Sequence, residues 1–228
     1  MERFVFIHPS GFTGEIFEKQ LAYFPGSAAP NLPGHDAAGS ASSVAEFADF
    51  IEQYLQAEQR DEVILCGNSL GGAVALEVAL RGNAHVQAVA LIGSGARLRV
   101  APRIFERLDA DFPGAVRELA PMFYANPTTE RTERAVSQME RVGKLQTLAD
   151  FRACDAFDAM ERLPGLRVPL LAITGDADVF TPPKYAAYLA DRVPRGELRI
   201  VPRAGHLVMD EASDDTNKAL ADFVTKLA

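Results

Sequence analysis

Residues 63–80, with the sequence VILCGNSLGGAVALEVAL, constrain the fold of this chain more than any other stretch. The branched apolar run at its start is typical of a strand buried on both faces in a parallel sheet. The run of Ala, Val and Leu after Gly72 predicts a helix, so the segment between them must turn the chain sharply. Ser69 lies in that turn, with a glycine two residues before it and another two residues after it. A turn with this G-x-S-x-G pattern pushes the serine hydroxyl out at the edge of the sheet.

Two other interpretations of the turn compete with that one. The serine could be incidental to a glycine-rich turn whose role is structural. A phosphate-binding loop is disfavoured, because the chain contains no G-x-x-x-x-G-K-[ST] pattern and no lysine follows the glycines. The rest of the chain has to decide between a reactive serine and an incidental one.

Strand and helix patterns alternate along much of the chain. Short apolar runs predict strands at residues 4–7, 63–66, 86–92, 168–174 and 198–201, with a weaker candidate at 28–32. Apolar residues at helical spacing predict helices at 16–24, 44–55, 72–80, 182–193 and 214–227, with Ser42 or Ser43 as the N-cap of the second. This alternation indicates an α/β fold, a mostly parallel central sheet flanked by helices.

The alternation stops at residues 97–164, where helical patterns broken by prolines predict no strand. A helical insertion between two strands of a parallel sheet has to lie at the carboxyl end or at the flank of that sheet. Placed over Ser69, it would form a lid. We therefore expect an α/β core formed by residues 1–96 and 165–228 and a helical cap formed by residues 97–164.

Several loops that follow the predicted strands carry side chains suited to acyl transfer, and in a parallel sheet such loops meet at one edge. Ser69 as a nucleophile needs a base, and His206 is the candidate because it follows the last strand, directly after a glycine. An acid must orient that histidine. We favour Asp178, which lies beyond its strand end, over its rival Asp176, which we expect to bond backbone in the turn.

Structural roles for these residues are the alternative. His206 could be a surface loop histidine, and Asp178 could be no more than a turn residue or a helix cap. Of the other histidines, we expect His35 to be structural, His85 to lie on the surface, and His8 to brace the loop that it begins.

Acyl transfer also needs hydrogen-bond donors for the oxyanion that develops at the carbonyl. One donor is normally the backbone N–H of the residue after the nucleophile, here Leu70. The second should come from the loop at residues 8–14. Pro9 has no N–H, which leaves Ser10 or Phe12.

A set of motifs spread over nearly the whole chain carries a family resemblance: Gly67-Asn68-Ser69-Leu70-Gly71-Gly72, Gly175-Asp176-Ala177-Asp178 with Pro182, Gly205-His206, Leu32-Pro33-Gly34-His35 and the loop at His8. With these motifs the chain resembles the α/β-hydrolase fold superfamily, in particular small bacterial serine hydrolases of carboxylesterase type with a helical cap. The resemblance implies a catalytic triad of Ser69, Asp178 and His206.

The chain departs from the family pattern at two places. The usual His-Gly at the start of the oxyanion loop is His8-Pro9 here. The loop has the family's length, so the usual donor position falls on Ser10, and Phe12 is then expected to contact substrate. The family's N-terminal antiparallel strands are expected to be absent, because the chain begins directly at the first parallel strand.

The function that we expect is hydrolysis of a carboxylic ester or a related acyl substrate through an acyl-enzyme on Ser69, without cofactor or metal. The alternatives are a carbon-carbon bond hydrolase, a lyase or a thioesterase with the same triad, and a ligand-sensing protein with slow turnover. Apolar side chains of the cap would suit a small or medium acyl group. Alternatively, they serve simply to pack the cap onto the core. These residues are Phe105, Met122, Phe123, Met139 and Phe151.

The composition limits the other partners and the location. A net charge of -8 disfavours nucleic acid, and no stretch is apolar enough for a membrane span. The amino-terminal apolar run is too short for a signal peptide, and Cys66 and Cys154 are expected to be reduced thiols. We therefore expect a cytoplasmic protein, whereas the sequence leaves monomer and homodimer open.

Overall fold

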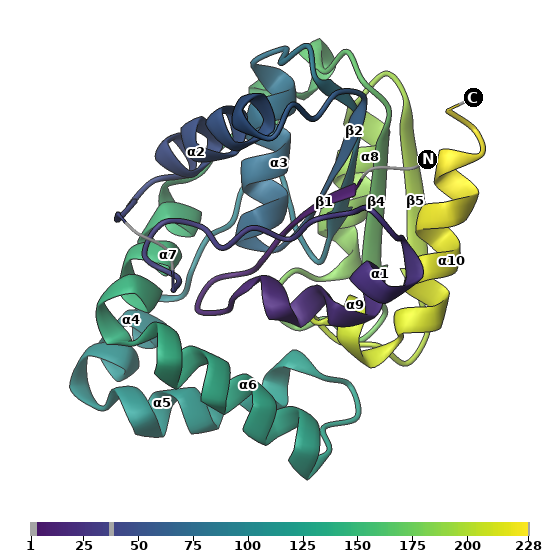
Figure 1. The fold of residues 1–228 in the computed structure, drawn as a ribbon. Coiled ribbons are helices and arrows are strands. Elements are labelled where there is room, and N and C mark those ends of the chain that lie inside the picture. Colours follow the sequence, from purple (N-terminus) through teal and green to yellow (C-terminus); the bar gives the residue numbers. More distant parts are fainter. Residues whose placement is uncertain (1–3, 37–38, 228) are drawn as a thin grey trace.

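The computed structural model describes residues 4–36 and 39–227, so the outermost limits of the expected core, residues 1 and 228, lie outside the described residues. In the described residues, parallel strands form one sheet in the order β1-β2-β3-β4-β5 (Figure 1). The strands are β1 (Phe4–Ile7), β2 (Val63–Asn68), β3 (Val86–Ile92), β4 (Leu170–Gly175) and β5 (Gly196–Val201). The predicted parallel α/β fold is confirmed.

Helices cover both faces of the sheet (Figure 1). Residues that alternate along β1 point to opposite faces, so Val5 packs with one helical layer while Phe6 packs with the other. The first layer consists of α2 (Val44–Ala57), α3 (Leu70–Leu80) and α8 (Pro183–Arg192), and the second of α1 (Glu18–Tyr23), α9 (Val208–Glu211) and α10 (Ser213–Val224). Burial of both faces explains why β1, β2 and β4 are nearly continuously apolar, whereas the edge strand β5, with the sequence GELRIV, is partly exposed.

Several element limits differ from the prediction. The first helix begins as a 3-10 turn, η1 (Gly14–Phe17), and the last predicted helix is divided into α9 and α10. Of the two candidate N-caps of α2, Ser43 is used: its hydroxyl accepts from the backbone N–H of Glu46 at 3.2 Å, and the Glu46 carboxylate accepts from the Ser43 N–H in return.

The predicted strand at residues 28–32 is wrong. Only Ala28 bridges to Val5, along the edge of β1 that does not pair with β2. The ladder ends there because Pro30 has no N–H to donate, and the Asn31 side chain turns to accept from the backbone of Gly14 at 2.8 Å. The chain therefore touches the outer edge of β1 only at Ala28 before it continues through α2 into β2.

The segment at residues 97–164 is helical, and the described structure contains no strand within it. Its elements are α4 (Pro102–Ala110), α5 (Phe112–Leu119), η2 (Ala120–Phe123), α6 (Thr129–Val142), α7 (Lys144–Ala156) and η3 (Met160–Gly165). Figure 1 shows α4, α5 and α6 grouped at one end of the sheet. The last part of the segment packs against α3 instead, since Ala153 and Leu163 belong to the same hydrophobic cluster as that helix.

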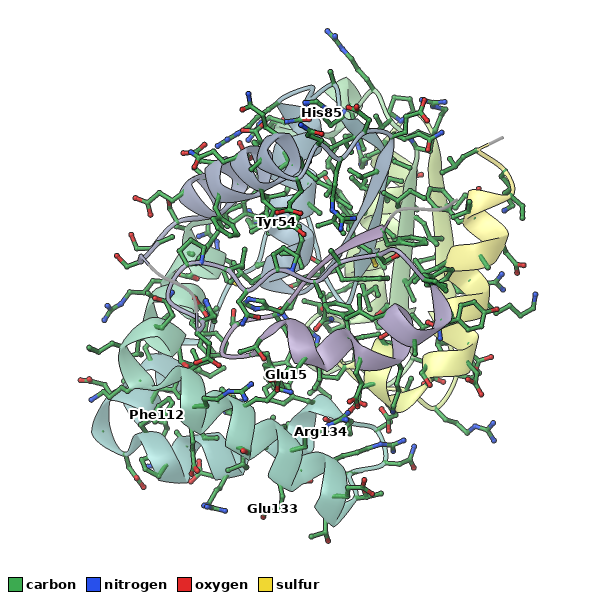
Figure 2. The ribbon with its side chains drawn as sticks, viewed as in Figure 1. Glu15, Tyr54, His85, Phe112, Glu133 and Arg134 are labelled. Atoms are coloured by element: carbon green, nitrogen blue, oxygen red, sulfur yellow. The ribbon has the colours of Figure 1, made fainter. Side chains whose placement is uncertain are left out.

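Ionic contacts tie this helical segment to the core. Figure 2 shows Arg134 of α6 on the side that faces the core, where it pairs with Asp210 and Glu18, whereas Glu133 points away. Lys19 also reaches the Asp210 carboxylate, at 3.0 Å. Burial acts to raise the pKa of Asp210, but hydrogen bonds from Arg134 and Lys19 outweigh it and hold that pKa below its usual range.

Candidate active site

The turn after β2 holds Ser69 in a strained conformation. Its φ of 53° and ψ of -113° are rarely adopted by a residue with a side chain. The glycines on either side permit this turn, because a Cβ at Gly67 would overlap the backbone of Gly71, and a Cβ at Gly71 would overlap the carbonyl of Ile7. Ser94 fastens the turn by donating its hydroxyl to the Ser69 carbonyl at 2.8 Å. Strain of this kind is concentrated at functional sites.

His206 and Asp178 are joined by a hydrogen bond. The Nδ1 of His206 lies 2.9 Å from the Oδ2 of Asp178, and both side chains are buried. The hydroxyl of Thr181 donates to the same carboxylate oxygen at 2.8 Å. A carboxylate at Nδ1 keeps the proton on that nitrogen and leaves Nε2 free to act as a base.

The environment of Asp178 favours its charged form. Burial acts to raise its pKa, but the charge of His206, followed by hydrogen bonds from His206 and Thr181, lowers the pKa below the usual value. Its rival Asp176 is exposed and accepts from the backbone N–H of Arg203 at 2.7 Å. Only Asp178 therefore contacts the histidine.

The backbone N–H groups of Ser10 and Leu70 donate no hydrogen bond to any described residue. That of Phe12, the other candidate donor, is used in a turn with the carbonyl of Pro9, 3.3 Å away. Leu70 is the first residue of α3, where a helix leaves its N–H groups without partners. Two donors are thus available beside Ser69.

His8 braces the start of the loop that carries Ser10. Its Nδ1 faces the Pro9 carbonyl at 3.0 Å, and its Nε2 accepts from the backbone of Leu32 at 3.0 Å. Burial is the main cause that lowers the pKa of His8 to about 3; the charge of His35 adds to it, and the bond to Pro9 opposes it. His8 therefore stays neutral, and its ring is fixed at both nitrogens.

A second buried pair holds the same loop, and no pattern in the sequence predicts it. Asp150 of α7 accepts from the backbone of Gly11 at 2.8 Å and from His35 Nε2 at 2.8 Å. Both side chains of this pair are fully buried. His35 was expected to be structural, but a partner 115 residues later in the chain leaves no pattern in a single sequence.

A cavity of about 710 Å³ contains Ser69 and His206 in its wall. Its size is that of a small-molecule site. Phe12 lines it, as do three of the five apolar cap residues singled out from the sequence: Met122, Phe123 and Phe151. Met139 and Phe105 do not line it: Met139 is buried in the hydrophobic core, and Phe105 is partly buried against that core.

The Ser69 hydroxyl makes no hydrogen bond to His206 within the described structure, although both residues line the same cavity. No set of three or more His, Cys, Asp or Glu side chains among the described residues could hold a metal ion. In the same residues, no helix is long and apolar enough to cross a membrane.

Comparison with known proteins identifies the family. The model of the alpha/beta hydrolase family matches residues 4–219. This chain belongs to that family. A thermophilic esterase of known structure is 33% identical to this α/β hydrolase, with a TM-score of 0.89 over 100% of this chain and 91% of the other.

Two further relatives cover nearly the whole α/β hydrolase. An N-acyl homoserine lactone degrading enzyme is 25% identical, with a TM-score of 0.84 over 98% of this chain and 93% of its own. The pimeloyl-[acyl-carrier protein] methyl ester esterase of Neisseria meningitidis is 27% identical over 96% of this chain and 91% of its own. The predicted class, a hydrolase of the esterase type, is confirmed by the family match and by these relatives.

Proposed function

We propose that this α/β hydrolase cleaves carboxylic esters through an acyl-enzyme on Ser69. His206 takes the Ser69 proton at Nε2 while the serine oxygen attacks the carbonyl carbon, and the N–H groups of Leu70 and Ser10 stabilise the oxyanion. The alcohol leaves with the proton from His206. A water molecule then gives its proton to His206, attacks the acyl group and releases the acid and free Ser69.

One observation carries this proposal: His206, which is paired with the buried Asp178, lines the same cavity as the strained Ser69. A structural histidine would need no buried carboxylate at Nδ1 and no access to a cavity. The charge of Asp178 stabilises the imidazolium that forms when His206 takes the serine proton.

The shape of the cavity and the names of the relatives support ester substrates. Phe12 and the residues contributed by the helical segment make the larger part of its wall apolar, which suits an acyl chain. Relatives are named as an esterase and as a methyl ester esterase, and both names refer to ester bonds. These names favour an ester over a carbon-carbon bond as the substrate.

The helical segment at residues 97–164 acts, in this proposal, as the cap over the site. The partner is a small acyl substrate, and a net charge of -8 is unsuited to nucleic acid. A cytoplasmic location is part of the proposal and is supported by the free thiols of Cys66 and Cys154, both buried.

The proposal is tested by Ser69→Ala, by labelling with a fluorophosphonate, and by p-nitrophenyl esters of increasing chain length. We expect the wild-type protein to be labelled at Ser69, as located by peptide mass spectrometry, and to hydrolyse the shorter esters. Ser69→Ala should lose both properties while its circular dichroism and melting temperature stay close to those of the wild type. Ester turnover by Ser69→Ala at the wild-type rate would refute the mechanism.

A further inference from the structure

A second cavity, of about 450 Å³, adjoins the one that contains Ser69. The two cavities share Arg99 and Tyr185 in their walls, so they lie side by side. The mechanism proposed above uses none of the residues that line the second cavity: Ala96, Arg97, Arg99, Met160, Lys184, Tyr185 and Tyr188.

Cations are abundant in the walls of the two cavities. Arg97, Arg99 and Lys184 line the smaller cavity, whereas Arg103 and Arg107 line the larger one together with Arg99. Among the described residues that line either cavity, the only acidic side chain is a glutamate on α5. The walls of the two cavities thus carry an excess of positive charge, although the whole chain has a net charge of -8.

Two of these cations are neutralised within the protein. Arg107 pairs with the glutamate on α5, Glu118, and Arg97 lies 3.7 Å from Asp158. The other three, Arg99, Arg103 and Lys184, form no ion pair with any residue that the structure describes, and all three are exposed. The side chain of Arg99 bonds only to the backbone carbonyl of Asp155, and a carbonyl group carries no net charge.

Arg103 and Lys184 also occupy positions where a cation is unfavourable to the helix that bears it. Each is the second residue of its helix, α4 or α8, and the first turn of a helix carries a partial positive charge. Neither helix has an acidic residue in its first turn. Helix stability therefore does not explain these two cations, and a residue that breaks a local rule is expected at a functional site.

We propose that the joined cavities bind an ester that carries an anionic group, a carboxylate or a phosphate, and that Arg99, Arg103 and Lys184 recognise this group. The inference rests on the proposed function, since it names the class of ester that reaches Ser69. Arginine binds both kinds of anion with parallel hydrogen bonds, and lysine adds a point charge. Positive charge around the entrance would also increase the rate at which anionic esters associate.

Matched ester pairs test the proposal. The first pair is monomethyl suberate and methyl suberamate, which differ by a carboxylate against a neutral amide. The second pair is the butyrate ester of hydroxyphenyl phosphate and the butyrate ester of hydroxybenzamide. For each pair the ratio of kcat/KM, charged over neutral, is measured. We expect a ratio of at least about fivefold in one pair, as for a charge contact at an exposed site. The pair that responds shows whether carboxylate or phosphate is the ligand.

The double variant Arg103→Gln/Lys184→Gln should lower that ratio toward one, since only Arg99 of the three cations remains. Raising the KCl concentration from about 0.05 M to about 0.5 M should lower the ratio for the wild type, because salt screens exposed charges. The matched control is Lys218→Gln, which removes an exposed cation of α10 paired with Asp222 and should leave the ratio unchanged.

The outcomes separate this inference from the proposed function. A wild-type ratio near one in both pairs, with all esters turned over, overturns the anion site and leaves the esterase standing. A ratio that the double variant does not change also overturns it. If Ser69→Ala turns over the neutral esters at the wild-type rate, the proposed function itself fails.

Discussion

Asp178 and Asp176 follow the same strand, yet only Asp178 contacts His206. We predict that Asp178→Asn lowers kcat by about 10³- to 10⁴-fold, because the amide removes the charge that stabilises the imidazolium and favours the wrong tautomer of His206. Asp176→Asn should change kcat by less than about threefold, since an amide oxygen can still accept from the backbone of Arg203. Steady-state kinetics with a p-nitrophenyl ester provide the measurement. A larger loss in Asp176→Asn would assign the acid to that residue.

Strain at Ser69 gives a second prediction for a single residue. Glycine adopts the φ of 53° found there without steric cost, whereas alanine does not. We predict that Ser69→Gly has a free energy of unfolding about 1 kcal/mol higher than Ser69→Ala, even after glycine's greater unfolded-state entropy is included. Both variants should be inactive. Urea denaturation followed by circular dichroism measures the difference, and an equal or lower stability of the glycine variant would show that the turn is relaxed.

At the scale of elements, α7 is connected to the oxyanion loop. The Asp150 carboxylate holds Gly11, the neighbour of the proposed donor Ser10, and pairs with His35 in a fully buried position. We predict that Asp150→Ala lowers kcat by about tenfold or more with little change in KM, because a misplaced donor weakens transition-state binding more than substrate binding. It should also lower the free energy of unfolding by about 3 kcal/mol, since a buried partner is left unpaired.

A merely structural role for Asp150 would not separate kcat from KM. The kinetics are therefore measured well below the melting temperature, together with the affinity for a boronic acid that mimics the tetrahedral intermediate, which should fall in parallel with kcat. Asp150→Asn retains an acceptor for Gly11 and should restore most of kcat. Arg152→Ala changes an exposed residue of the same helix and serves as the control.

At the scale of the whole molecule, the order of strands and helices could be predicted because one physical rule links them. Parallel strands all end at the same edge of the sheet, so Ser69, Asp178 and His206 could be brought together from their positions after strands alone. The same rule does not cover the helical segment. For Met139 the sequence left two roles open, contact with an acyl group or packing, and the side chain is buried in the core; helical spacing shows which residues share a face and not what that face meets.

Side-chain contacts between residues far apart in the chain could not be predicted from the sequence either. The bonds from Asp150 to Gly11 and His35 cross more than 100 residues, and each depends on how α7 lies against the core. The weak strand at residues 28–32 failed for a local reason, since Pro30 ends the ladder after the single bridge at Ala28. The topology could therefore be predicted from the sequence, whereas the contacts that hold the loop at residues 8–14 could not.

The stability of the whole molecule should depend on pH through His8. Its pKa is lowered from 6.5 to about 3, so between these values the unfolded chain binds a proton that the folded chain does not. The contribution of neutral His8 is complete above pH 6.5 and is lost as the pH falls toward 3. One proton changes the free energy of unfolding by up to about 1.4 kcal/mol per pH unit. The carboxyls of Asp178 and Asp210, whose pKa values are lowered, affect stability only below about pH 4.

Urea denaturation at intervals between about pH 7.5 and pH 4.5 measures this dependence. We predict that the free energy of unfolding of His8→Gln falls less steeply with decreasing pH than that of the wild type, by about 1 kcal/mol per unit below pH 6. The control is Gln56→Ala, which removes an exposed side chain without a titratable group and should keep the wild-type slope. Equal slopes for His8→Gln and the wild type would mean that His8 takes up its proton without unfolding, and the brace on the Ser10 loop would then be weaker than its two hydrogen bonds indicate.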